Sequence, residues 1–244
     1  MPIPYSGDRG LSGRLHGTWS DRYACRPADG YLAAGVNAKP AGGLHSPEII
    51  IYSADLAELL GILEAKDLEA LAAWLLFRLE ALHRAGAEFA VIASNTPHVV
   101  FDEVARRSPL PMLSIVEATC EKAESLGLKR PGLMGTRFTM AADFFFKPFH
   151  ARGMSLAVPS PDEQQFIHEK LFSEIELGII KDSTRQELLA IVEKMIARDA
   201  IDSLILGCTE LPLILDRDAF GIPFLNTAAI HVDSIVRAAM EGEA

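Results

Sequence analysis

Two stretches of the chain share one plan: VIASNTPH at residues 91–98 and LILGCTEL at residues 204–211. Each is an apolar run of strand length, followed by a small residue, a side chain that can carry a proton, and a threonine within two residues. The proton-carrying side chains are Ser94 and Cys208, about half the chain apart. This repetition predicts two similar lobes, each of which contributes one strand end to a shared cleft.

Apolar runs of strand length alternate with helix-length segments from about residue 48 onward. This β–α alternation predicts parallel sheets covered by helices on both faces, with function at the carboxyl ends of the strands. Helices are expected up to about residue 85, from 97, at 117–127, from about 138, at 161–177, at 183–198, from 209 and at the C-terminal end. The expected strands are EIIIYS (48–53, as a buried strand), FAVIAS (89–94), MLSIV (112–116), GLM (132–134), MSLAVP (154–159), SLILG (203–207) and PFLN (223–226).

The segment 1–45 differs from the rest of the chain. Its residues 6–31 contain no apolar run of strand length. The first strand that an α/β domain usually has is therefore expected to be missing or disguised there.

Composition narrows the class of protein. The 244 residues are 49% apolar, enough for one large core or two modest ones. A formal charge of -10 argues against a nucleic-acid-binding surface, which needs clustered Lys and Arg. No apolar run approaches the roughly 20 residues that span a bilayer, and the N-terminus lacks the pattern of a targeting segment. We therefore expect a cytoplasmic protein with reduced thiols that binds neither nucleic acid nor membrane.

A pair of proton-carrying groups at facing strand ends suits proton transfer on both faces of a carbon acid. One group removes an α-proton and the other returns it from the opposite side. Simpler interpretations stay open at this point. Ser-Asn-Thr after a strand is typical of a turn or helix cap, and a cysteine near a strand end is typical of a small buried apolar residue.

The chain resembles the aspartate/glutamate racemase family, the cofactor-independent amino-acid racemases, over about residues 42–241. The resemblance lies in the order and spacing of several segments. It implies two similar parallel-sheet α/β lobes related by a pseudo-twofold axis, with the active site in the cleft between them. It also implies a homodimer and neither pyridoxal phosphate nor metal. The segments are GGLHSPEIIIYS (42–53), SNTPH (94–98, where the family typically has Cys-Asn-Thr-x-His), GLMGTRFTM (132–140), GCTELPLIL (207–215) and FLNTAAIHVDSI (224–235).

Carried over position by position, the resemblance assigns roles to individual residues. Ser94 and Cys208 take the places of the two catalytic thiols. His98, Glu210 and Arg137 are candidates to tune the site, although a packing histidine, a first-turn carboxylate and a solvated arginine are the simpler interpretations. The candidate binders of substrate are Asn95, Thr96, Thr139 and Thr209. The lobes are expected to comprise residues 1–115 with 225–244, and residues 116–224.

The first departure from the family pattern is Ser94 in place of a cysteine. A free thiol has a pKa near about 8.5, whereas a hydroxyl is closer to the value of about 15.7 for water. A gap of roughly seven units corresponds to about 9 kcal/mol. An unassisted serine is thus a poor base, so Cys208 is expected to be the only good base and the two enantiomers to react at unequal rates.

The second departure concerns the side chain of the substrate. Members that are specific for aspartate resemble one another in carrying an Arg and a Lys where this chain has Leu60 and Glu176. An apolar group and an anion do not hold a second carboxylate. We therefore expect a substrate other than aspartate, or a broader range of substrates.

The third departure lies in the N-terminal segment. The resemblance becomes visible only around YLAAGV (31–36), where family members have already passed a strand and a Gly-rich loop. Loss of that strand would compromise the first lobe and weaken activity.

Two alternatives to the racemase interpretation remain open. A decarboxylase or isomerase of a small dicarboxylic acid needs only one thiol. A catalytically silent homologue would bind carboxylates without turning them over.

Overall fold

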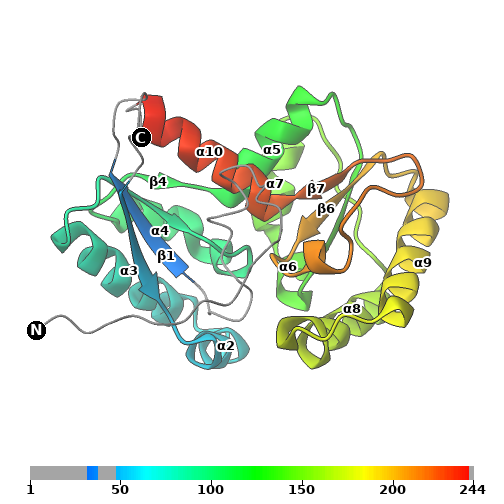
Figure 1. Ribbon diagram of the computed structural model, residues 1–244, viewed down its shortest axis with the longest axis horizontal. Coiled ribbons are helices and arrows are strands. Elements are labelled where there is room, and N and C mark those ends of the chain that lie inside the picture. The colour runs from blue at the N-terminus through cyan, green and yellow to red at the C-terminus, as the bar shows by residue number, and fades with distance from the viewer. Residues whose placement is uncertain (1–31, 38–47, 242–244) are drawn as a thin grey trace, which may run out of the picture.

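The computed structural model describes residues 32–37 and 48–241, which fold into two sheets with helices around them (Figure 1). The first sheet has the strand order β2-β1-β3-β4 and the second the order β5-β6-β7. The fold class expected from the sequence, an α/β protein of two lobes with parallel strand pairing, is confirmed. The first sheet adds antiparallel pairs to this plan.

The first sheet and its helices come from the first half of the described chain. Strands β3 and β4 are parallel, and β3 ends at Ile92, two residues before Ser94. The elements are β1 (Leu32–Asn37), β2 (Glu48–Ser53), α2 (Leu56–Glu64), α3 (Leu68–Arg84), β3 (Phe89–Ile92), the 3-10 helix η2 (Thr96–Val100), α4 (Phe101–Arg107) and β4 (Met112–Leu113).

Strand β1 lies in the segment 1–45, where the first strand was expected to be missing or disguised. It lies inside the sheet and pairs antiparallel with β2 on one side and with β3 on the other. Its sequence, LAAGVN, is short and rich in Ala and Gly, so it forms no apolar run that periodicity would reveal. The backbone hydrogen bonds to two neighbours define this strand more than its side-chain pattern does.

Strand β2 was expected to be buried, and this expectation is wrong. The side chain of Ile51 is 60% exposed and that of Ile49 is 39% exposed. Among the strands that the structure describes, β2 is at the edge of the sheet, with β1 as its one neighbour. The apolar run EIIIYS predicted the strand correctly but not its position in the sheet, because a run of apolar residues does not by itself distinguish an edge from a centre.

Helix caps account for several boundaries that differ from the expected ones. The expected long helix is two helices, because Asp67 accepts a hydrogen bond from the Ala70 N–H and begins α3. The expected strand at 112–116 stops at Leu113, because Ser114 caps the next helix by accepting from the Val116 and Glu117 N–H groups.

The expected strand at 154–159 is absent, and the segment contributes one isolated bridge between Ala157 and Gly132.

The second sheet is parallel throughout and lies between two apolar clusters. Its central strand, β6, ends directly before Cys208. The elements that follow β4 are α5 (Ile115–Ser125), β5 (Pro131–Gly135), α6 (Arg137–Ala141), α7 (Asp143–Ala151), α8 (Pro161–Ser173), the 3-10 helix η3 (Ile175–Leu177), α9 (Asp182–Asp199), β6 (Ser203–Gly207), the 3-10 helix η4 (Leu211–Leu213), β7 (Phe224–Asn226) and α10 (Thr227–Glu241).

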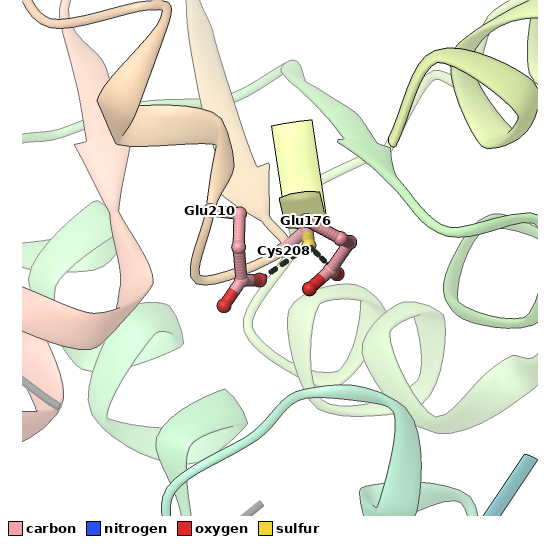
Figure 2. A group of neighbouring side chains, drawn as sticks. All are labelled: Glu176, Cys208 and Glu210. Carbon is pink, nitrogen blue, oxygen red and sulfur yellow. Dashed lines mark hydrogen bonds between the residues drawn. The ribbon is translucent and has the colours of Figure 1, made fainter. Parts of the chain in front are cut away.

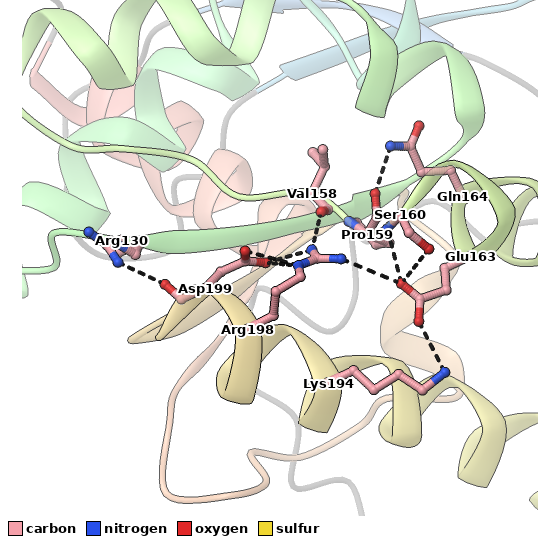
Figure 3. Close-up of polar contacts among 9 residues, drawn as sticks. All are labelled: Arg130, Val158, Pro159, Ser160, Glu163, Gln164, Lys194, Arg198 and Asp199. Carbon is pink, nitrogen blue, oxygen red and sulfur yellow. Dashed lines mark hydrogen bonds and ion pairs between the residues drawn. The ribbon is translucent and has the colours of Figure 1, made fainter.

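Helices α8 and α9 are tied together at the start of α8 (Figure 3). Ser160 and Glu163 form a reciprocal capping box, and the Glu163 carboxylate also accepts from Lys194 of α9 at 3.1 Å. Arg198 of α9 donates to the Val158 carbonyl at 2.7 Å. These contacts fix α8, whose C-terminal end leads into η3 and so sets the position of Glu176.

Helix α10 connects the two sheets. It packs along α5, its residues Ala238 and Ala239 contact Phe89 and Val91 of the first sheet, and Ile230 packs against the core of the second (Figure 1). A single helix therefore packs against both sheets. No helix in the described part of the chain is long and apolar enough to cross a bilayer.

Candidate active site

Ser94 lies at the carboxyl end of β3, in a buried turn that leads into η2. Its side chain is 4% exposed. The backbone carbonyl of Ser94 accepts a hydrogen bond from His98 Nδ1 at 2.8 Å. Ser94 is thus held by its backbone, and its hydroxyl is not engaged by His98.

His98 has a defined tautomer. The Ile115 N–H donates to His98 Nε2 at 3.3 Å, so Nε2 must be the unprotonated nitrogen and Nδ1 carries the proton that reaches Ser94. Burial, with nearby His231 as the second cause, lowers the pKa of His98 to about 3. Both ring nitrogens are occupied and the ring stays neutral, so His98 positions the Ser94 turn and does not serve as a base for its hydroxyl.

Asn95 connects the two strand ends. Thr227 Oγ1 donates to the Leu206 carbonyl of β6 at 2.9 Å, so it must accept its 3.0 Å contact from Asn95 Nδ2. This fixes the orientation of the Asn95 amide. The opposite atom, Asn95 Oδ1, is buried and has no hydrogen-bond partner among the described residues. A buried acceptor without a donor suits an incoming N–H group of a ligand.

Three threonine hydroxyls form a second connection, from β3 to the end of β5. Thr96, Thr136 and Thr139 lie 3.1 Å from one another, hydroxyl to hydroxyl, and all three are buried. Thr136 also caps α6 by accepting from the Thr139 N–H. Two of the three threonines predicted as substrate binders, Thr96 and Thr139, are thus brought together with Thr136, which sequence reasoning missed.

Cys208 lies among carboxylates (Figure 2). Its sulfur is 3.0 Å from Glu210 Oε2 and 3.7 Å from Glu176 Oε1. Burial is the main cause that raises the pKa of the Cys208 thiol well above its usual value, and the charges of Glu210 and Glu176 add to it. The resting group is therefore a thiol that donates a proton, whereas the sequence predicted a good base.

Glu176 was noted in the sequence as an anion in an unexpected place, but not as a neighbour of Cys208. Burial, and then the charge of Glu210, raise the pKa of Glu176 to about 8. Glu174, two residues earlier, shows the opposite behaviour. Hydrogen bonds from Thr184, Lys181 and Lys170 lower its pKa to about 2. The difference arises because Glu174 has cationic and hydroxyl partners, whereas Glu176 has neither kind among the described residues.

The remaining predicted residues lie as follows. Thr209 is half-buried and donates its hydroxyl to the Glu210 carboxylate at 2.8 Å and 2.9 Å. Arg137 is exposed and its guanidinium contacts Gln165 of α8, so its recorded contacts are not with the strand ends. Leu60 packs against the core of the first lobe.

The elements after Ser94 and Cys208 differ from the helices that were expected there. Both are 3-10 helices, of five and three residues. Such short turns do not present the aligned N–H groups of an α-helix N-terminus.

Three residues of the site were missed or misread in the sequence. Thr136 has a recognisable signal, since it occupies the cap position before RFTMA. Thr227 and Glu176 have none, because their meetings with Asn95 and Cys208 depend on the tertiary fold. We assign no metal or cofactor site among the described residues, and independence from cofactors stays a prediction.

A family model described as Asp/Glu/Hydantoin racemase matches residues 33–235. The chain is 28% identical to the broad specificity amino-acid racemase RacX of Bacillus subtilis over 155 residues, which cover 64% of this chain and 66% of that protein. It is also 28% identical to the glutamate racemase of Streptococcus gordonii over 126 residues. That match spans 51% of this chain and 46% of the glutamate racemase.

Solved structures give longer matches. A putative Asp/Glu racemase from Yersinia pestis superposes with a TM-score of 0.73 at 31% identity, and an aspartate racemase homologue from Pyrococcus horikoshii OT3 with 0.69 at 33%. Each match covers 82% of this chain and 86% of the other. With the family model extending over most of the chain, these matches show that the protein belongs to the Asp/Glu/hydantoin racemase family.

Proposed function

We propose that the protein is an amino-acid racemase that works without pyridoxal phosphate, with Ser94 and Cys208 moving the α-proton on opposite faces of the substrate. The observation that carries the proposal is the hydrogen-bonded connection from Asn95 through Thr227 to the strand of Cys208. This connection supports a fixed separation of two buried, proton-bearing strand ends. Fixed separation is what two-sided proton transfer requires.

The substrate-binding role falls to side chains around this connection. Asn95 Oδ1 is a buried acceptor in need of a donor and suits the ammonium group of an amino acid. The hydroxyls of Thr96 and Thr139 are donors that can turn toward a carboxylate as it gains enolate-like charge. Family membership supports these roles, which we carry over from the sequence comparison.

The acidity around Cys208 bears on which substrate is accepted. Glu176 and Glu210 have no cationic partner in the described part of the chain, and both lie beside the sulfur that would touch the α-carbon. A second carboxylate on the substrate would meet like charge there. We therefore favour a monocarboxylic amino acid with a neutral or cationic side chain over a dicarboxylic acid, which also weighs against the dicarboxylate decarboxylase alternative. The related enzyme of B. subtilis, RacX, is a broad specificity amino-acid racemase, which accords with this choice.

Exchange of the α-proton in heavy water tests the proposal. Each enantiomer of a panel of acidic, neutral and basic amino acids is incubated with the protein, and deuterium at the α-carbon is followed by NMR. We expect exchange with at least one monocarboxylic amino acid, at unequal rates for its two enantiomers because a hydroxyl is the weaker proton carrier. Cys208→Ala should abolish exchange from both enantiomers.

Ser94→Cys is the matched variant for the other strand end. It should speed racemisation if the two-sided geometry is intact, while Ser94→Ala should slow inversion and leave one-sided exchange. If the wild type exchanges the α-proton and the Cys208→Ala variant still does so, the proposal is contradicted. A protein that binds amino acids in calorimetry but exchanges none would favour the silent homologue.

Further proposals are the lobe boundaries near residues 115 and 225, the homodimer and the cytoplasmic location.

A further inference from the structure

The distances within the Cys208 cluster, formed by Glu176, Cys208 and Glu210, constrain where its protons lie. The sulfur and the carboxylates of Glu176 and Glu210 offer atoms that all lie within 4.8 Å of one another (Figure 2). A thiol has one proton to donate, and the 3.0 Å contact assigns it to Glu210 rather than to Glu176 at 3.7 Å. The contact between the sulfur and Glu176 is then a hydrogen bond only when the Glu176 carboxyl supplies a proton of its own.

The partners of the two carboxylates separate their roles. Glu210 accepts from the Thr209 hydroxyl as well as from Cys208, as an ionised carboxylate does. Glu176 receives no hydrogen bond from a hydroxyl, amide or cation of the described chain. A partly buried carboxyl that lacks a cationic or hydroxyl partner and lies beside an anion is more stable in its neutral form, so geometry and hydrogen bonding place one negative charge on Glu210 and a proton on Glu176.

The charged groups on the neighbouring elements do not alter this assignment. Lys170 of α8 and Lys181, just before α9, both pair with Glu174 at 3.1 Å and 3.0 Å. Arg137 of α6 donates to Gln165. His168, also on α8, contacts the rings of Phe138 and Phe172. None of these groups has a recorded ion pair with Glu176.

We propose that Glu176 is a positioning residue for the Cys208 proton: it stays protonated in the resting site, so that Cys208 can become a thiolate. The inference rests on the proposed function in so far as the thiolate is the base for the α-proton. In the first step the S–H bond breaks and its proton passes to Glu210, which turns from carboxylate to carboxylic acid. In the second step the thiolate forms a new S–H bond with the α-proton while the C–H bond of the substrate breaks.

The charge of the cluster explains why the proton of Glu176 matters. With Glu176 protonated, the cluster carries one negative charge before and after the first step, and the thiolate faces two neutral carboxyl groups that can donate to it. With Glu176 ionised, the cluster carries two negative charges, and a thiolate would lie beside an anion at short range. The pKa of Glu176 at about 8 is consistent with the protonated form at neutral pH.

Alkylation of Cys208 tests this role without any substrate. Wild type, Glu176→Gln and the control Glu193→Gln are treated with iodoacetamide between pH 7 and pH 10, and labelling of the peptide that contains Cys208 is measured by mass spectrometry. Glutamine is neutral and can donate, so it imitates the protonated acid. Above pH 8 the wild-type cluster gains a charge that the variant cannot, and we expect about tenfold faster labelling of Glu176→Gln than of wild type at pH 9.

Glu193 lies exposed on α9, so its change to glutamine removes the same charge away from the site and should label like wild type. Equal or slower labelling of Glu176→Gln than of wild type at pH 9 would overturn the inference. Thermal unfolding checks that both variants are folded.

The pH profile of α-proton exchange is the second measurement. Exchange by the wild type should fall about tenfold per pH unit above pH 8, whereas that of Glu176→Gln should not fall there. Glu176→Ala is neutral but cannot donate, and should exchange roughly ten- to hundredfold more slowly than the glutamine variant. A folded but inactive Glu176→Gln would mean that the anion is needed and would overturn the inference. If the wild type exchanges with no amino acid, the proposed function fails, and the alkylation rates still decide the role of Glu176.

Discussion

Thr227 is a residue whose single hydroxyl satisfies two buried groups from different parts of the fold. It donates to the Leu206 carbonyl and accepts from the Asn95 amide, and none of its surface is exposed. A buried polar group that loses its partner costs about 1–3 kcal/mol. The connection between the strand ends is therefore also a contribution to stability.

Thr227→Val keeps the shape of the side chain and removes its hydroxyl. We expect the free energy of unfolding to fall by about 2–4 kcal/mol, because the Leu206 carbonyl and the Asn95 N–H both lose a partner. Urea denaturation measures the change. The control Thr227→Ser keeps the hydroxyl and should lose only about 1 kcal/mol, the contribution of one buried methyl group. Equal losses in both variants would show that the hydroxyl is not what stabilises this contact.

The sequence predicted the residues of the site better than their chemistry. Ser94 and Cys208 were recognisable as candidates because they follow strand ends in a repeated pattern, whereas Asn95, Thr96 and Thr139 became candidates through the family resemblance. Their protonation could not be predicted, because the pKa of a thiol depends on which charges the fold places around it. Glu176 is 32 positions from Cys208 in the chain, and no local sequence pattern predicts that the two side chains are in contact.

At the scale of elements, β5 and β6 approach closely where they end at the site. A Cβ atom added to Gly135 would lie 2.8 Å from the Gly207 carbonyl oxygen and 3.3 Å from Thr139 Cβ. Backbone atoms of a central strand cannot move aside as a flexible side chain can. The glycine is therefore required for the close approach of the two strand ends that lead into Thr139 of α6 and into Cys208.

Gly135→Ala should destabilise the protein by about 1–3 kcal/mol through this overpacking. The matched control is Gly61→Ala in α2, where an added Cβ meets nothing within 4 Å. That change should raise stability by about 0.5–1 kcal/mol, because alanine is the better helix former. Thermal and urea unfolding of the pair check the prediction, which fails if Gly135→Ala is tolerated as well as Gly61→Ala.

Elements were predictable where apolar residues are dense and hard to detect where backbone pairing decides. SLILG and PFLN form strands as expected, since buried parallel strands are short apolar runs. LAAGVN was missed because alanine and glycine give no such signal. MSLAVP was wrongly predicted as a strand, since its apolar residues pack against the cores of the second lobe without joining a ladder.

At the scale of the whole molecule, the buried histidines and Glu176 make the free energy of unfolding depend on pH in opposite directions. Burial lowers the pKa of His98 to about 3 and that of His231 to about 4, from 6.5 in an exposed histidine. Below pH 6.5 the unfolded chain binds protons that the folded chain does not, so each histidine costs about 2 kcal/mol at pH 5. Glu176 acts in the opposite direction. Its raised pKa penalises the folded state as pH rises from 4.5 to 8.

His231→Gln separates these contributions. Glutamine can donate to the Leu113 carbonyl as His231 Nε2 does at 3.2 Å, but it does not titrate. When the pH falls from 7 to 5, the free energy of unfolding should decrease in both proteins, and by about 2 kcal/mol less in the variant than in the wild type. Urea denaturation at several pH values measures this difference. The exposed control His83→Gln should keep the wild-type slope, and identical slopes in all three proteins would refute the buried neutral state of His231.

The placement of β1 between β2 and β3 sets an order of assembly during synthesis. Strand β1 leaves the ribosome before both of its partners, and it can pair with β2 as soon as residue 53 has emerged. Among the described strands, its other edge has no partner through the synthesis of α2 and α3, until β3 is complete at residue 92. An open strand edge pairs readily with other chains. The nascent protein therefore passes through a stage in which this edge needs a chaperone or rapid helix docking to stay monomeric.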